Sequence, residues 1–344
     1  MTAVARAPVI DLIGDTAPLV DAFHRPITYL RISVTDRCNL RCTYCMPEAG
    51  LPWIAKREIL TYEEIAEIVA AAASVGVRAV RLTGGEPLVR RDLATLVAAL
   101  AAIPGIDDIS LSTNGLLLAE QIDGLVAAGL RRVNVSLDTL RPDRFEAIAR
   151  RPGLERVLAG IDAAIAAGLA PIKLNCVAMR GVNDDEIEDF ARLAHERAVY
   201  VRFIEMMPVL ENLASQRSEY ISAGELVERL RATRELVAVP GPGGNGPARY
   251  YAAPGSLGAI GTISPLSHDY CETCNRVRLT ADGRLRLCLF GDSELDLRTP
   301  LRAGASRDEL AEVFRTGMLV KPERHHLELG EISSRMRAFS EIGG

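Results

Sequence analysis

The chain has 344 residues, enough for a large hydrophobic core and for one large domain plus a smaller one. Its net charge of −5 argues against a surface that binds nucleic acid or anionic membranes. No apolar run is long enough to span a bilayer, and the first 26 residues lack the apolar core of a signal peptide. We therefore expect a cytoplasmic protein with no membrane or nucleic-acid partner.

The first elements of the chain alternate between strand and helix from about residue 28 to residue 210. Repeated βα units predict a parallel sheet covered by helices. Six units are fewer than the eight of a closed barrel, so an open, partial barrel is our first expectation and a flat doubly wound sheet is the alternative. The predicted strands are 27–34, 78–83, 108–113, 132–137, 171–179 and 200–205, and the predicted helices are 61–74, 91–102, 120–128, 142–149, 154–167 and 184–196.

The character of the sequence changes after about residue 220. Residues 240–247 are rich in Gly and Pro and predict a loop. The segment that follows is shorter and more strand-like, and a helical pattern returns at 307–316. We divide the chain into an N-terminal extension (1–26), a partial barrel (27–225) and a smaller C-terminal α+β region (226–344).

The seven cysteines are odd in number and grouped, which in a long cytosolic chain is typical of metal binding rather than of disulfides. Cys38, Cys42 and Cys45 form one group, with the spacing C-x3-C-x2-C at the end of a predicted strand. Three thiolates on one loop leave one iron of a [4Fe–4S] cluster open to a small molecule. A zinc site is the alternative, although no fourth ligand is close in sequence. Cys176 stands alone in a strand-like run, where we expect a small buried residue.

A Gly-Gly-Glu-Pro segment (residues 84–87) follows the second predicted strand. Two glycines at a strand end let the backbone approach a ligand, so its free N–H and C=O groups can bind the polar end of an amino acid. Without the cysteine loop, a plain βα turn is an equally good interpretation.

A second group of three cysteines lies in the C-terminal region, at Cys271, Cys274 and Cys288. We interpret it as the ligand set of a second cluster with an open iron. A zinc site completed by Cys176 or by His268 is the alternative.

Basic residues occur inside predicted apolar strands. Arg276 and Arg278 are two residues apart on a strand and therefore point the same way, toward an anionic ligand beside the second cysteine group. Arg31, Arg81 and Lys173 also interrupt apolar strands, where a cation must be paired or face a polar cavity. Ion pairs with Glu86 or Asp138, or a solvated strand face for the arginine pair, are the alternatives.

The C-x3-C-x2-C loop, the aromatic Tyr44 before its last cysteine and the Gly-Gly-Glu-Pro turn together resemble the radical S-adenosylmethionine (SAM) superfamily. The resemblance implies a partial (βα)6 barrel in which the open iron binds the amino and carboxylate groups of SAM. It implies that the cluster reductively cleaves SAM to a 5′-deoxyadenosyl radical.

Across nearly the whole chain, the sequence also resembles the GTP 3′,8-cyclase family of molybdenum cofactor biosynthesis. The resemblance rests on both cysteine groups with Arg276 and Arg278, and on the segments 35–37, 45–48, 81–88, 112–115, 134–138, 202–205 and 343–344. Ser112 stands where threonine is usual in the family, and Cys176 replaces a common threonine or valine. Neither departure touches a predicted cluster ligand.

The resemblance implies two [4Fe–4S] clusters, SAM as cofactor and GTP as substrate, whose ribose C3′ loses hydrogen and bonds to guanine C8. It assigns cluster ligation to Cys38, Cys42, Cys45, Cys271, Cys274 and Cys288; SAM binding to Tyr44, Gly85, Glu86, Ser136 and Met207; GTP binding to Arg31, Arg81, Ser112, Lys173, Arg276 and Arg278; and catalytic roles to Arg31, Arg276, Arg278, Gly343 and Gly344.

The expected partners are an unidentified electron donor and the next enzyme of the pathway, and the chain is expected to be a monomer or homodimer. Three other functions remain open. A two-cluster electron carrier would not need six βα units, and a peptide-maturing radical SAM enzyme would usually carry more C-terminal cysteines. A zinc-binding regulator would contain no iron.

Overall fold

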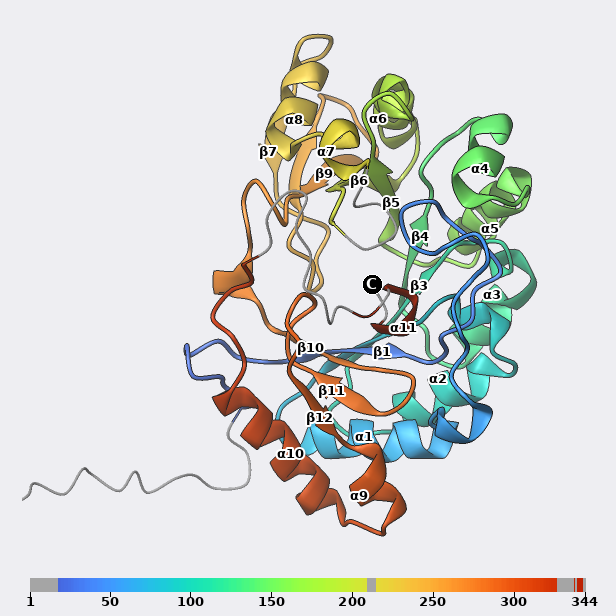
Figure 1. Ribbon diagram of the computed structural model, residues 1–344. Helices are drawn as coiled ribbons and strands as arrows, with labels where there is room; N and C mark the ends of the chain where they lie inside the picture. The colour runs from blue at the N-terminus through green and yellow to red at the C-terminus, as the bar shows by residue number, and fades with distance from the viewer. Residues whose placement is uncertain (1–17, 209–214, 327–336, 338, 343–344) are drawn as a thin grey trace, which may run out of the picture.

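The computed structural model describes residues 18–208, 215–326, 337 and 339–342. One curved sheet runs through it, with helices on its outer side (Figure 1). Its central strands follow the chain in order and are parallel: β1 (Tyr29–Ser33), β2 (Ala79–Thr83), β3 (Asp108–Thr113), β4 (Arg132–Ser136), β5 (Ile172–Ala178) and β6 (Val199–Glu205). A doubly wound sheet would reverse its strand order at a switch point. The sequential order therefore confirms the predicted partial barrel.

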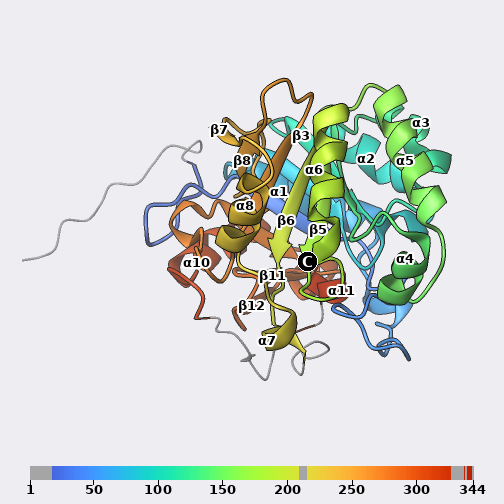
Figure 2. The same ribbon diagram turned by 90° about the horizontal axis from the view of Figure 1, so that it is seen from above.

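Six α-helices connect these strands, and Figures 1 and 2 show them outside the sheet. They are α1 (Tyr62–Ser74), α2 (Leu93–Ala101), α3 (Leu118–Ala127), α4 (Pro142–Ala149), α5 (Leu154–Ala166) and α6 (Ile187–Glu196). Local sequence sets their ends: Thr61 and Glu64 form a capping box at the start of α1. Gly76, Gly129 and Gly168 have positive φ values just after α1, α3 and α5, the backbone conformation that glycine favours where a helix ends.

The C-terminal region extends the same sheet at both edges. Next to β1, the parallel strand β10 (Arg276–Leu279) is followed by antiparallel β11 (Arg284–Arg286) and β12 (Glu294–Asp296). Next to β6, the parallel strand β9 (Ala259–Ile263) is followed by antiparallel β8 (Arg249–Ala252) and β7 (Val237–Val239). The Gly/Pro-rich segment 240–247 connects β7 to β8.

The remaining helices are α7 (Gln216–Glu219), α8 (Ala223–Arg231), α9 (Arg298–Arg302), α10 (Arg307–Leu319) and α11 (Phe339–Ile342). Helix α10 confirms the predicted return of helix and packs on α1. The boundary drawn between residues 225 and 226 falls within α8, and strands from both sides of it share one sheet. The division into domains stays a prediction. No helix in the described ranges is long and apolar enough to cross a membrane.

The hydrophobic core lies between the sheet and its outer helices. Leu30 and Ile32 of β1 and Val80 and Leu82 of β2 are fully buried there. The residues between them in sequence, Arg31 and Arg81, belong to the opposite side of the sheet because side chains alternate along a strand. Polar residues in an apolar strand therefore mark the inner face of the barrel.

Candidate active site between two cysteine groups

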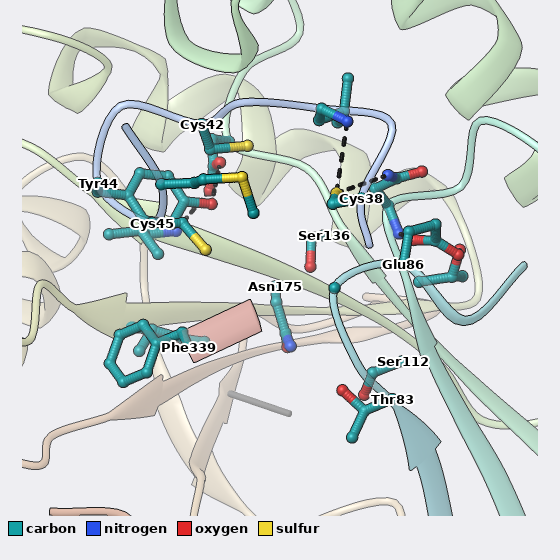
Figure 3. A pocket seen from close by; sticks show the side chains of 18 of the residues that line it. Cys38, Cys42, Tyr44, Cys45, Thr83, Glu86, Ser112, Ser136, Asn175 and Phe339 are labelled. Atoms are coloured by element: carbon teal, nitrogen blue, oxygen red, sulfur yellow. Dashed lines mark hydrogen bonds between the residues drawn. The ribbon is translucent and has the colours of Figure 1, made fainter. Parts of the chain in front are cut away.

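The first cysteine loop lies where β1 ends, at the carboxyl edge of the sheet. Cys38, Cys42 and Cys45 line a cavity of about 200 Å³ together with residues that follow β2, β3, β4 and β6. Figure 3 shows the three thiols on one side of this cavity, with Ser136, Asn175 and Ser112 below them. Parallel strands bring their carboxyl ends to one edge, so residues far apart in sequence meet there.

The Gly-Gly turn fits against the chain just before these cysteines. The N–H of Gly85 donates to the carbonyl of Thr35 at 2.8 Å, and the N–H of Glu86 donates to the carbonyl of Arg37 at 2.8 Å. A Cβ on Gly85 would lie 2.3 Å from the Arg37 carbonyl oxygen. Only glycine allows this approach, so the turn has a structural reason for its composition and is more than a plain βα connection.

All five residues assigned to SAM line the same cavity: Tyr44, Gly85, Glu86, Ser136 and Met207. Ser112, which was assigned to GTP, lines it as well. The cavity therefore combines three thiols with backbone and hydroxyl groups that could hold a small polar cofactor. These positions fit the predicted SAM site, and the roles of the individual residues stay proposals.

Two buried carboxyl groups organise the walls of this cavity. Glu86 accepts hydrogen bonds from the N–H groups of Leu88 (3.0 Å) and Asn114 (2.6 Å) and from Thr113 Oγ1 (2.8 Å), which ties the turn after β2 to the end of β3. Asp138 accepts from Tyr44 Oη at 2.7 Å. Burial raises the pKa of Glu86 to about 7 and that of Asp138 to about 6.

The thiols themselves are held in a setting that opposes ionisation. Burial raises the pKa of Cys38 to about 11. It also raises the pKa of Cys42 well above its ordinary value, with further contributions from Cys45, Asp138 and Cys38. Iron coordination requires thiolates, so cluster binding would release these protons. Asn114 Nδ2 lies 3.9 Å from Cys38 Sγ and can donate to it, a contact of the kind that tunes the potential of a bound cluster.

A layer of cations lies within the strands below the cavity. Lys173 and Arg278 are each 3% exposed and Arg81 is 8% exposed. Arg81 Nε donates to Ser110 Oγ (3.1 Å), Lys173 Nζ to the Gly243 carbonyl (2.9 Å), and Arg276 Nη2 to the Asn245 carbonyl (3.4 Å). These acceptors are neutral, and Glu86 and Asp138 are bound by the neutral donors described above. The alternative in which these two carboxylates neutralise the strand cations is therefore wrong for Arg81 and Lys173.

Burial and the mutual repulsion of the cations set the electrostatics of the layer. Burial, and then the charges of Arg202, Arg132 and Arg81, lowers the pKa of Lys173 to about 7. Burial and Arg276 lower the pKa of Arg278 to about 10. Burial and Arg278 lower the pKa of Arg31 well below its ordinary value. Each positive charge in the layer raises the free-energy cost of keeping its neighbours protonated. A bound anionic ligand would offset that cost.

The second cysteine group lies at the opposite end of the barrel. Cys271 and Cys274 immediately precede β10, and Cys288 follows β11, which is antiparallel to β10. Burial raises the pKa of Cys271, and the charges of Asp269, Cys288 and Cys274 add to this, so the three thiols lie near enough to influence one another. Because β10 runs parallel to β1, with Arg276 opposite Tyr29 and Arg278 opposite Arg31, this group lies beside the start of β1 and the first group beyond its end. The cation layer is between them.

Comparisons with known proteins agree with this arrangement. Residues 32–194 match the model of the Radical SAM superfamily, and residues 199–327 match that of Molybdenum Cofactor Synthesis C. The chain is 51% identical to the GTP 3′,8-cyclase of Heliobacterium modesticaldum, over 95% of this chain and 100% of that one. It is also 51% identical to that of Moorella thermoacetica, over 94% and 99% of the two chains.

The chain belongs to the GTP 3′,8-cyclase family. Among solved structures it resembles Streptococcus suis SuiB bound to the precursor peptide SuiA, with a TM-score of 0.59 and 14% identity over 88% of this chain and 72% of that one. At that identity the likeness concerns the radical SAM fold alone. It confirms the fold class expected from the cysteine loop and the βα pattern.

Sequence reasoning missed one buried cation of the layer. Arg202 of β6 was not singled out although it interrupts an apolar strand just as Arg31 does. It is 3% exposed and its Nε donates to Asn175 Oδ1 at 2.9 Å. Burial, with Arg81 nearby, lowers the pKa of Arg202 to about 10. The rule that selected Arg31, Arg81 and Lys173 would have found it.

Two further predictions concern cysteine and the end of the chain. Cys176 is 2% exposed and its Sγ lies 3.6 Å from the Asp138 carbonyl, which confirms a buried residue in the barrel wall. In the described ranges, no three His, Cys, Asp or Glu side chains are placed to share a single metal ion.

Gly343 and Gly344 lie outside the described residues. The preceding α11 lies within the curve of the sheet, and its Phe339 lines the cavity beside the first cysteine loop (Figures 1 and 3).

Proposed function

We propose that this chain converts GTP to (8S)-3′,8-cyclo-7,8-dihydro-GTP, the first step of molybdopterin biosynthesis, and that the residues between the two cysteine groups bind GTP. The observation that carries the proposal is the pairing of β1 with β10. It places a layer of buried cations between two sets of three thiols. A polyanionic nucleotide fits a layer of that charge.

Cys38, Cys42 and Cys45 would hold one [4Fe–4S] cluster, and Cys271, Cys274 and Cys288 would hold the other. When bound, the first cluster and SAM supply the 5′-deoxyadenosyl radical that takes hydrogen from ribose C3′. Tyr44, Gly85, Glu86, Ser136 and Met207 would orient SAM in the cavity they line. The wall of the partial barrel would keep water and stray hydrogen donors away from this reaction.

The cation layer would fix the triphosphate so that the ribose faces the SAM cavity and the guanine faces the second cysteine group. Arg31, Arg81, Lys173, Arg276 and Arg278 supply the charge, and Ser112 at the edge of the SAM cavity supplies a hydroxyl. Arg31, Arg276 and Arg278 would also stabilise the nucleotide as C3′ bonds to C8. Gly343 and Gly344 are proposed to act from the end of the chain.

The other expectations are proposals as well. An external electron donor is required because SAM cleavage consumes one electron, and a second electron and a proton are needed to quench the radical left on the guanine once C3′ has bonded to C8. The following enzyme of the pathway would take up the product. A cytoplasmic location, a monomeric or homodimeric state and the absence of a nucleic-acid partner rest on composition and cysteine grouping.

The test is anaerobic reconstitution with iron and sulfide, followed by incubation with SAM, a strong reductant and each of GTP, ATP and a peptide. The proposal predicts 5′-deoxyadenosine formation that depends on GTP, together with the cyclised product. Equal turnover with ATP, or turnover with the peptide alone, contradicts it. An electron carrier would not cleave SAM, and a zinc-binding regulator would contain no iron.

A further inference from the structure

Tyr29 is a buried tyrosine within the cation layer. It is the first residue of β1, only 2% exposed, and lies opposite Arg276 of β10. Because Arg31 follows two residues later, both side chains point to the inner face of the barrel. The guanidinium carbon of Arg81 lies 5.6 Å from the centroid of the Tyr29 ring. The phenol therefore points into the space enclosed by three arginines.

The Tyr29 hydroxyl is buried and forms no hydrogen bond with any described residue. A buried hydroxyl without a partner costs about 1–3 kcal/mol, so native structures rarely keep one unless something else bonds to it. Sequence reasoning gave no role to this residue, and none of the interactions described above uses its hydroxyl.

The surroundings determine what kind of partner is missing. The nearby side chains Arg81, Arg31 and Arg276 are donors and offer no acceptor. The Asp108 carboxylate, which raises the pKa of Tyr29, is already bound by Arg132, whose Nε lies 3.0 Å from Asp108 Oδ1. Burial raises the pKa of Tyr29, yet the three arginines outweigh it and hold that pKa below its ordinary value. A negatively charged oxygen is the acceptor that satisfies the hydroxyl and the guanidinium groups together.

We propose that the Tyr29 hydroxyl donates a hydrogen bond to a phosphate oxygen of bound GTP, beside Arg81 and Arg276. The proposal rests on the proposed function, because it takes GTP as the ligand of the cation layer. Tyr29 is then a substrate-binding residue whose hydroxyl is satisfied only in the complex. Its neutral donor adds direction to a site in which the arginines supply charge.

The experiment replaces Tyr29 by phenylalanine, which removes one oxygen atom and keeps the ring. GTP binding to the anaerobically reconstituted protein is measured by calorimetry, and the thermal midpoint is measured without GTP. Tyr29→Phe is expected to weaken GTP binding by about 10- to 100-fold, the range for a hydrogen bond to a charged group. The midpoint without ligand should stay the same or rise, since a partnerless buried hydroxyl has been removed.

Tyr62→Phe is the matched control. Its hydroxyl donates to the Arg91 carbonyl at 2.7 Å on the surface, and its removal should leave GTP affinity unchanged. A purely structural role for Tyr29 would give the opposite result, a lower thermal midpoint with unchanged GTP affinity, and would overturn the proposal.

Guanosine separates the phosphate chain from the rest of the nucleotide. The loss in affinity should vanish when guanosine replaces GTP, and an equal loss with guanosine would overturn the phosphate assignment. Binding is measured without turnover. A protein that binds GTP through Tyr29 but forms no cyclised product would contradict the proposed function and leave this inference standing.

Discussion

The two ends of the barrel present the same number of cysteines in different electrostatic surroundings. At the carboxyl end, Glu86 and Asp138 act with burial to raise the pKa values of Cys38 and Cys42, and Arg41 opposes this at Cys38. At the other end, burial raises the pKa of Cys274, but Lys321 and Arg276 outweigh it and lower that pKa. Three thiolates therefore do not by themselves define a site, because the charges around them differ.

The difference matches two different tasks. Carboxylates near a cluster disfavour an added electron and make the reduced cluster a stronger reductant, which SAM cleavage needs. Cations near a cluster attract an anionic ligand and favour the bound nucleotide. The strand β1 lies between the two settings and itself spans about 13 Å, at roughly 3.3 Å per residue.

Cysteine substitutions should give the largest difference in activity between the two ends of the barrel. Cys42→Ser is expected to abolish SAM cleavage entirely, whereas Cys288→Ser is expected to keep slow SAM cleavage and to lose the cyclised product. Each variant should fall from about eight to about four iron atoms per chain, because one cluster of each pair is lost. Iron analysis and chromatography of 5′-deoxyadenosine check both. Identical behaviour of the two variants would break the comparison.

Removing a cation of the layer should give the next largest effect. Arg278→Ala deletes a guanidinium group that is 3% exposed and faces the space between the clusters. The KM for GTP should rise by about 10- to 150-fold, since a charge-assisted bond contributes about 1.5–3 kcal/mol. SAM binding should stay unchanged. Arg307→Ala, which removes a surface ion pair with Glu67, is the control and should leave KM as it was.

The close approach at the carboxyl end makes Gly85 sensitive to a single methyl group. Gly85→Ala would put a Cβ 2.3 Å from the Arg37 carbonyl oxygen, and a backbone atom cannot swing aside. We expect the free energy of unfolding to fall by about 1–3 kcal/mol and iron to be lost from the first cysteine group. Gly124→Ala in α3 has no atom within 4 Å of its Cβ and should instead stabilise by about 0.5–1 kcal/mol. Denaturant unfolding of both proteins tests the contrast.

The smallest expected effect is a pH dependence in the cation layer. The pKa of Lys173 is lowered to about 7, so its ammonium group is charged below that pH and neutral above it. GTP affinity should therefore fall, by up to about 10-fold, as the pH rises from about 6 to about 8. Lys173→Arg keeps its positive charge over this pH range, so GTP affinity should depend less on pH in that variant. Lys56→Arg on the surface should leave the pH dependence unchanged. The same pH dependence of GTP affinity in Lys173→Arg and in the unaltered protein would contradict a phosphate-binding role for Lys173.

Much of the fold could be predicted from sequence because the pattern of the first two thirds is local. Alternating strand and helix periods, a capping box at Thr61 and glycines such as Gly76 mark the elements where they occur. The cysteine loop and the Gly-Gly turn were found by spacing. The division of the chain at residue 225 stays a prediction, and that position falls within α8.

The cation layer was only partly found, for a physical reason. Arg31, Arg81 and Lys173 are conspicuous because a charge interrupts an apolar run, and Arg202 does the same. Tyr29 is different, because a tyrosine at the start of a strand is ordinary in any sequence. Only its burial and the absence of a hydrogen-bond partner among the described residues distinguish it.

The sequence by itself determined the βα order, the two sets of three cysteines and the glycines that allow the first set to be approached closely. The tertiary structure decided that β10 pairs with β1 in parallel, which sets Arg276 beside Tyr29 and Arg278 beside Arg31. Local periodicity cannot specify a pairing between segments so far apart in the chain, because it depends on how the sheet edges meet once the helices have packed. That pairing places the two cysteine groups at opposite ends of one charged interior.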